Sequence, residues 1–115
     1  MITDKTFIGQ EASLSIFNGQ AIIDLPFEFV LNDCAESDFS FPGFSSAYLT
    51  IYNERRGNLL IDLSSRMTHS GKFLVLNASA ADMTFEDLGK YEYEMGYIQT
   101  GGYSIVLRYG ELIVL

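Results

Sequence analysis

The chain has 115 residues, of which 48% are hydrophobic and 19% are charged, and its formal net charge is −8. This length is typical of one domain with its own core, and the hydrophobic content excludes a disordered chain. The acidic balance, with no basic stripe, argues against a nucleic-acid partner and against an anionic membrane surface. We therefore expect a single domain over residues 1–115, with no nucleic-acid and no membrane partner.

Apolar residues at every second position predict β-strands along most of the chain. Strands are expected at residues 12–16, 23–31, 47–52, 59–63, 73–76, 91–97, 103–109 and 112–115. Pro26 cannot donate to a ladder, so the strand that contains it lies at a sheet edge or bends there. Seven to eight short strands with regular turns are typical of a sandwich or a barrel. We expect an all-β fold, specifically an immunoglobulin-like antiparallel β-sandwich.

The segments between these strands predict the connections. Residues 53–58 and 99–102 carry the Asn and Gly signals of hairpin turns. Residues 64–71 are polar and are expected to form a loop, and residues 78–88 are expected to form a helical turn or a loop that crosses the sandwich. Gly110 is expected to mark a bulge.

The most informative motif is Asp87-Leu-Gly-Lys-Tyr-Glu-Tyr93. Immunoglobulin-like domains often carry Asp-x-Gly/Ala-x-Tyr-x-Cys at the start of a late strand, where the tyrosine hydroxyl bonds to upstream backbone. Asp87, Gly89 and Tyr91 match this pattern, and Tyr93 stands where the cysteine would be. We expect these residues to act structurally, with packing in place of a disulfide.

A second motif, residues 38–44, places three phenylalanines, Phe39, Phe41 and Phe44, in a Pro/Gly-containing loop. Such a loop either folds over an open end of the sandwich or docks into a neighbouring protein, because exposed apolar patches mark interfaces. Tyr48 and Tyr52 point away from the predicted core face of their strand. We take these aromatic residues as the candidate interface.

Catalytic chemistry has little support in the sequence. His69 is the only histidine and lies in a polar segment, so any Ser-His-Asp or Cys-His site must include it. Cys34 has acidic neighbours, which raise a thiol pKa and disfavour a reactive thiolate. Glu92 and Glu94 share the polar face of a strand, where solvation is the ordinary interpretation. We expect no enzyme activity and no catalytic residues.

Metal and cofactor binding are not expected either. The single Cys and single His cannot form a zinc site. The acidic loops do not have calcium-loop spacing. Those loops contain Asp33, Glu36 and Asp38 in one segment and Asp82, Glu86 and Asp87 in another. No Gly-rich phosphate loop precedes a helix.

The second half of the chain resembles a known group of proteins. The pattern Leu88-Gly-x-Tyr-x-Tyr93, a Gly-rich turn, an alternating strand and then Gly110-x-x-x-Val114 is similar to small virion proteins of tailed phages, in particular the N-terminal β-sandwich domain of baseplate upper proteins. The resemblance covers residues 46–115. It implies a non-enzymatic structural protein of the phage head or tail/baseplate, with other virion proteins as partners in a homo-oligomer, ring or shell.

The single cysteine and the N-terminal residues bear on the compartment in which the protein is made. One cysteine allows no intrachain disulfide, and the first residues do not form a signal peptide. We therefore expect a protein that is made in a cytoplasm, and the resemblance implies a location in the virion after assembly in the host cytoplasm. A carbohydrate- or peptide-binding β-sandwich module is the first alternative, since tyrosine-rich faces can stack on sugars, although the chain has no tryptophan. A small inhibitor protein is the second alternative.

Overall fold

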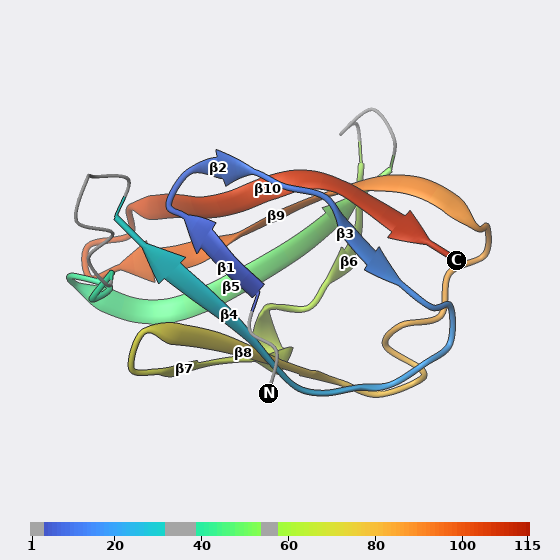
Figure 1. The fold of residues 1–115 in the computed structure, drawn as a ribbon, viewed down its shortest axis with the longest axis horizontal. Helices are drawn as coiled ribbons and strands as arrows, with labels where there is room; N and C mark the ends of the chain where they lie inside the picture. The colour runs from blue at the N-terminus through green and yellow to red at the C-terminus, as the bar shows by residue number, and fades with distance from the viewer. Residues whose placement is uncertain (1–3, 32–38, 54–57) are drawn as a thin grey trace.

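A computed structural model describes residues 4–31, 39–53 and 58–115 of the chain, and these residues form a β-protein with two sheets (Figure 1). The elements are β1 (Asp4–Phe7), β2 (Gln10–Glu11), β3 (Leu14–Ile16), β4 (Ile22–Val30), β5 (Phe44–Tyr52), β6 (Leu59–Asp62), the 3-10 helix η1 (Ser64–Arg66), β7 (Met67–Ser70), β8 (Phe73–Ala78), β9 (Gly89–Gln99) and β10 (Ser104–Val114). The predicted all-β character is confirmed.

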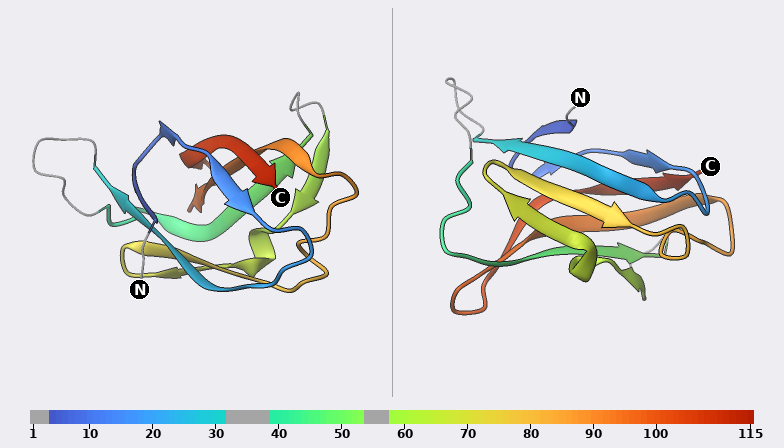
Figure 2. Two further views of the ribbon diagram at one scale, coloured as in Figure 1. Left: turned by 45° about the vertical axis from the view of Figure 1, so that its right-hand side comes forward. Right: turned by 90° about the horizontal axis from the view of Figure 1, so that it is seen from below.

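The strands divide into a four-stranded sheet, in the order β1-β4-β8-β7, and a six-stranded sheet, in the order β2-β10-β9-β5-β6 with β3 also paired to β10. Figure 2 shows the two sheets as separate layers. The sheets are mixed, whereas the sequence predicts antiparallel pairing. β1 runs parallel to β4, and β2 and β3 run parallel to β10. This difference arises because the N-terminal strands add to one edge of each sheet, and their chain direction is the same as that of the strand beside them.

The core lies between the two sheets and is built by the predicted alternation of side chains. The inward positions of β4, β5, β8, β9 and β10 are almost fully buried. The largest of them include Phe27, Phe29, Leu49, Ile51, Leu74, Leu76, Met95, Tyr97, Leu107 and Leu112. Because one face of each of these five strands packs on this core, a slip of one residue in any of them would move its apolar side chains to the outside.

One predicted loop is a strand. Residues 64–71 contain η1 and β7, and Met67–Ser70 pair in antiparallel register with β8. Met67 is buried and the three following side chains are exposed. The prediction of a loop is wrong. β7 is held by backbone hydrogen bonds to β8 on one side, and its mostly polar side chains do not show the alternation of apolar residues from which the other strands were predicted. β7 and the short N-terminal strands bring the described residues to ten strands, against the seven to eight expected.

The β4 strand is irregular just before its proline, and Pro26 itself pairs in register with Val75 of β8. Asp24 has a φ of 49°, and the register with β8 shifts between Ile22 and Leu25. The Asp24 amide donates to the Asn77 side-chain oxygen instead of to a ladder partner. Among the described residues, β1 pairs with β4 from Phe27 onward, so Pro26 precedes the part of the strand that is paired there on both sides.

The predicted bulge at Gly110 is absent, because Gly110 pairs in register with Tyr93. The register of β10 shifts instead between Val106 and Arg108. A Cβ atom on Gly110 would lie 2.4 Å from the Ala12 carbonyl oxygen. Glycine is therefore required at this position by the close approach of the segment between β2 and β3.

Both hairpin predictions concern connections within the six-stranded sheet. At residues 99–102 the turn joins β9 to β10, and Gly101 and Gly102 have φ values of 105° and 93°. The Gly102 amide donates to the Gln99 carbonyl at 2.9 Å. β5 and β6 also pair as an antiparallel hairpin. The residues of its turn that carry the sequence signal, 54–57, lie outside the described residues.

Candidate interaction surfaces

The motif around Tyr91 forms the local contact that its sequence predicts. The Tyr91 hydroxyl donates to the Asp87 carbonyl at 2.7 Å, four residues upstream. Gly89 takes a φ of 122° and pairs with Val114 at the start of β9. The Tyr91 ring, which is partly buried, contacts the Phe85 ring at a centroid distance of 5.0 Å. The hydrogen bond between Tyr91 and Asp87 holds the segment that leads into β9 against the first residues of that strand.

Tyr93, two residues further along β9, ties the sheet to the N-terminal segment. Its side chain is almost fully buried, and its hydroxyl donates to the Ala12 carbonyl at 2.6 Å. Ala12 follows β2, which pairs with β10 along the edge of β10 that faces away from β9. The contact is structural, and it spans 81 residues of sequence.

The phenylalanine loop packs into the core, so the prediction that it forms an exposed interface is wrong. Phe39 and Phe41 are 7% and 2% exposed, and Phe44 is partly buried. The Phe41 ring makes edge contacts with Phe29 and with Tyr97 at centroid distances of 6.1 and 5.5 Å. The other possibility raised by the sequence, that the loop covers an open end of the sandwich, is the one observed.

Hydrogen bonds hold this loop against β9. The Tyr97 hydroxyl and the Gln99 side-chain amide both donate to the Pro42 carbonyl, at 2.9 and 3.0 Å. Burial raises the pKa of the Tyr97 phenol, which therefore remains a neutral donor. Phe41 has a φ of 55°, a conformation that bulky residues rarely adopt and that surrounding contacts must enforce.

Tyr48 and Tyr52 lie on the outer face of the six-stranded sheet, as predicted, but neither is freely exposed. Tyr48 is 9% exposed and Tyr52 is partly buried. The Tyr48 ring lies across Gly96 of β9, and its hydroxyl donates to Glu94 at 3.0 Å. Tyr48 is therefore held against its own sheet, which corrects its assignment as an interface residue.

The close packing of Tyr48 explains why residue 96 is a glycine, and it predicts that a larger residue at this position destabilises the fold. A Cβ atom on Gly96 would lie 2.0 Å from the Ile105 carbonyl oxygen and 2.9 Å from the Tyr48 hydroxyl oxygen. We expect Gly96→Ala to lower the free energy of unfolding by an amount at the upper end of about 1–3 kcal/mol, because the backbone of β10 must move. Urea denaturation measures the loss. Gly71→Asn is the control, since Gly71 has open space around it and asparagine tolerates its φ of 60°; an equal loss in both variants would contradict the argument.

Arg108 is a buried cation that the alternating pattern conceals. The bulge between Val106 and Arg108 places the consecutive residues Leu107 and Arg108 both in buried positions, whereas regular alternation assigns Arg108 to the outside. Arg108 is 2% exposed. Its guanidinium lies 5.5 Å from the centroid of the Phe27 ring. No sequence signal marks this position, because the bulge is set by pairing with β9.

The guanidinium of Arg108 completes the link between β10 and the N-terminal segment. Its Nε donates to the Tyr93 hydroxyl, and one terminal nitrogen donates to the Ser13 carbonyl at 2.9 Å. The Tyr93 hydroxyl in turn donates to Ala12. We call Arg108, Tyr93 and the Ala12–Ser13 carbonyls the arginine network. Such a network stabilises the fold because each buried polar group has a partner.

Of the residues considered for catalysis, His69 and Glu94 lie on different sheets. His69 is exposed on β7 and contacts the rings of Phe41 and Phe44, with its Nε2 atom 2.8 Å from the Gly71 carbonyl oxygen. Glu94 accepts the Tyr48 hydroxyl bond on the opposite sheet. Cys34 lies outside the described residues.

The acidic segments are not arranged as metal sites within the described residues. No group of three or more His, Cys, Asp or Glu side chains there is placed to hold a metal ion. Asp82 instead closes a turn: it accepts from the Ser79 amide at 2.9 Å and from the Arg66 guanidinium at 2.8 Å. These contacts hold the pKa of Asp82 below its ordinary value. Asp33, Glu36 and Asp38 lie outside the described residues.

The structure reveals exposed apolar side chains where neighbouring strands of the six-stranded sheet end. Gly89, Val114 and Ile16 stand in register on β9, β10 and β3, so these strands end side by side, and Leu88, Leu115 and Phe17 are the residues directly outside those ends. Leu115 donates to Ile16 and accepts from Asn18, which fixes it beside Phe17. Leu88, Leu115 and Phe17 are each more than half exposed. We call these three residues the terminal patch.

Comparison with protein-family models and with curated proteins finds no match for this chain. The candidate surfaces therefore rest on geometry and on the sequence pattern alone. None of the helices in the described residues has the length and apolar character needed to cross a membrane.

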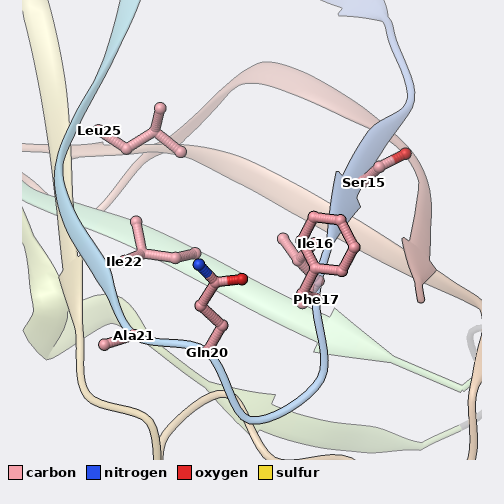
Figure 3. A pocket seen from close by; sticks show the side chains of 7 residues that line it. All are labelled: Ser15, Ile16, Phe17, Gln20, Ala21, Ile22 and Leu25. Atoms are coloured by element: carbon pink, nitrogen blue, oxygen red, sulfur yellow. The ribbon is translucent and has the colours of Figure 1, made fainter.

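A pocket of about 200 Å³ adjoins the terminal patch at the opening between β3 and β4. It is lined by Ser15, Ile16, Phe17, Gln20, Ala21, Ile22 and Leu25. Figure 3 shows Ile22 and Leu25 projecting from β4 toward β3, with the Gln20 side chain between them and Phe17. Phe17 belongs to both the patch and the pocket, so the apolar surface continues from the sheet end into this opening. The sequence does not reveal it, because Phe17 adjoins a short strand with a weak alternating pattern.

Proposed function

We propose that this chain is a non-enzymatic structural protein of a tailed-phage virion, in the head or the tail/baseplate, that acts through protein–protein contacts in an oligomeric assembly. The observation that carries the proposal is the terminal patch. Three large apolar side chains at the ends of adjacent strands are each more than half exposed, and exposed apolar surface of this kind marks protein interfaces. Phe17 extends this surface into the neighbouring pocket.

The finer fold assignment within this proposal is an immunoglobulin-like sandwich. In chain order, the strands β4, β5, β6, β7, β8, β9 and β10 divide as β4-β8-β7 in one sheet and β10-β9-β5-β6 in the other. This division corresponds to strands B-E-D facing G-F-C-C′ in immunoglobulin domains. The bond from Tyr91 to Asp87 supports it, since β9 takes the position of strand F, where a tyrosine corner occurs.

The virion location rests on the resemblance of residues 46–115 to small tailed-phage virion proteins. That segment runs from within β5 through β10 and so includes the whole hairpin of β9 and β10, which ends at the terminal patch. Within this proposal, the partners are other virion proteins and further copies of the chain, and the protein resides in the particle after assembly in the host cytoplasm.

Mass spectrometry of gradient-purified particles, from the phage whose genome encodes this chain, tests the proposal. We expect the chain to be present at a copy number set by the symmetry of the head or the tail, because structural proteins occupy equivalent positions. Its absence from purified particles, while the protein is abundant in the lysate, would contradict the virion role. A non-structural phage protein measured in the same lysate controls for carry-over into the gradient.

A further inference from the structure

Asn18 and Gly19 form the only Asn-Gly step in the chain. They are the central residues of a turn that follows β3: the Gln20 amide donates to the Phe17 carbonyl at 3.2 Å, and Gly19 has a φ of 74°. Both residues are exposed. An asparagine loses ammonia most readily when glycine follows it, because glycine has no side chain to keep its backbone nitrogen away from the asparagine side chain.

The loss of ammonia needs no reactant other than water. The Gly19 backbone nitrogen gives up its proton and attacks the Asn18 Cγ atom. A bond forms between these two atoms, the bond from Cγ to Nδ2 breaks, and Nδ2 leaves with the proton as ammonia. Water then opens the cyclic succinimide at either carbonyl carbon and gives aspartate or isoaspartate. The reaction therefore requires that the Gly19 nitrogen and the Asn18 side chain are free to approach each other.

In the fold, the segment between β8 and β9 holds both reacting groups. The Gly19 amide donates to the Met83 carbonyl at 2.9 Å, and the Asn18 side-chain oxygen accepts from the Phe85 amide at 2.7 Å. Met83 and Phe85 are 1% and 4% exposed, so their side chains anchor this segment in the core. The bond to Met83 favours the protonated Gly19 nitrogen, and the bond from Phe85 fixes the orientation of the Asn18 amide.

A capped turn fixes the backbone groups of this segment. The Asp82 carboxylate accepts from the Ser79 amide at 2.9 Å, and the Ser79 hydroxyl oxygen accepts from the Asp82 amide at 3.1 Å. The Met83 amide donates to the Ser79 carbonyl at 3.2 Å. Asp82 therefore positions the Met83 carbonyl that holds the Gly19 amide.

We propose that Asn18 is a deamidation site whose reaction is controlled by residues 79–85. While this segment is in place, Asn18 remains an amide, and separation of the segment from the turn lets the ring form. Isoaspartate adds a carbon atom to the main chain between residues 18 and 19. The Asn18 and Gly19 amides, which bond the Leu115 and Met83 carbonyls, then cannot both return to their partners. The inference goes beyond the virion role and does not depend on it, because it concerns the isolated chain.

Peptide mapping by mass spectrometry tests the proposal on the full chain, incubated folded and in guanidinium chloride. We expect Asn18 to convert in the unfolded chain and to convert at least about tenfold more slowly in the folded chain, because only an open minor state can react. Asn77 precedes alanine, so it is the internal reference and should convert far more slowly than Asn18 in the unfolded chain. An Asn18 that stays intact in the unfolded chain would refute the site, and equal folded and unfolded rates would refute its control.

Asp82→Ala and Asp62→Ala locate the control in residues 79–85. Each replaces a carboxylate that accepts a serine amide at 2.9 Å, from Ser79 and from Ser64. We expect Asp82→Ala to speed the conversion of Asn18 in the folded chain severalfold, as loss of a cap loosens the turn, and Asp62→Ala to leave the rate unchanged. Circular dichroism verifies that both variants are folded. Equal rates in the two folded variants would overturn the proposed control, and the wild-type comparison decides it if Asp82→Ala does not fold.

Discussion

Replacement of Arg108 by methionine is expected to lower the free energy of unfolding by about 3–5 kcal/mol, because hydrogen bonds from a charged group are each worth about 1.5–3 kcal/mol. Arg108 donates to the Tyr93 hydroxyl and to the Ser13 carbonyl within the arginine network. Methionine retains the apolar part of the side chain but leaves the Ser13 carbonyl without this donor. The loss therefore reports the polar contacts more than the packing volume.

Urea denaturation followed by circular dichroism measures this loss. Arg66→Met is the matched control: Arg66 also bonds an oxygen partner, Asp82, but its side chain is 48% exposed. Exposed ion pairs contribute about 0–1 kcal/mol, so the control should lose little stability. A double-mutant cycle with Tyr93→Phe should show coupling between Arg108 and Tyr93. Equal losses at Arg66 and Arg108, or additive losses in the cycle, would contradict the arginine network.

Replacement of Phe41 by alanine is expected to cost about 3–5 kcal/mol, the range for removing a buried phenylalanine from a core. Phe41 is 2% exposed and contacts aromatic rings from β4, β9 and its own loop. Alanine leaves a cavity beneath the loop. The unfavourable φ of residue 41 remains in the variant, because alanine is no better suited to it than phenylalanine.

Phe17→Ala is the control for this experiment, since it removes the same side chain from a position that is 62% exposed. Surface substitutions usually change stability by less than about 0.5 kcal/mol, so the two variants should differ several-fold in their loss. Thermal and urea denaturation of both variants measure the difference. If Phe41→Ala were as mild as Phe17→Ala, the phenylalanine loop would be a surface feature, as an interface role requires. Phe17→Ala should instead affect contacts made by the terminal patch.

The sequence by itself determined the features that depend on neighbouring residues. Alternation at positions such as Phe27 and Phe29 predicted strands and their buried faces, because successive side chains in a strand point to opposite sides. Gly101 and Gly102 predicted the turn between β9 and β10, since both take φ values that glycine adopts without strain. The hydrogen bond from the Tyr91 hydroxyl to the Asp87 carbonyl was also predictable, because it joins two residues only four positions apart in one sequence motif.

The tertiary structure decided the features that depend on pairing between distant segments. Register with β9 places the bulge at Leu107 and so buries Arg108, although the local pattern assigns Arg108 to the surface. Packing against β4 and β9 draws Phe41 into the core. Register across β9, β10 and β3 assembles the terminal patch from residues that stand apart in the sequence. A single strand specifies which of its faces is apolar, but only its partners determine whether that face is covered.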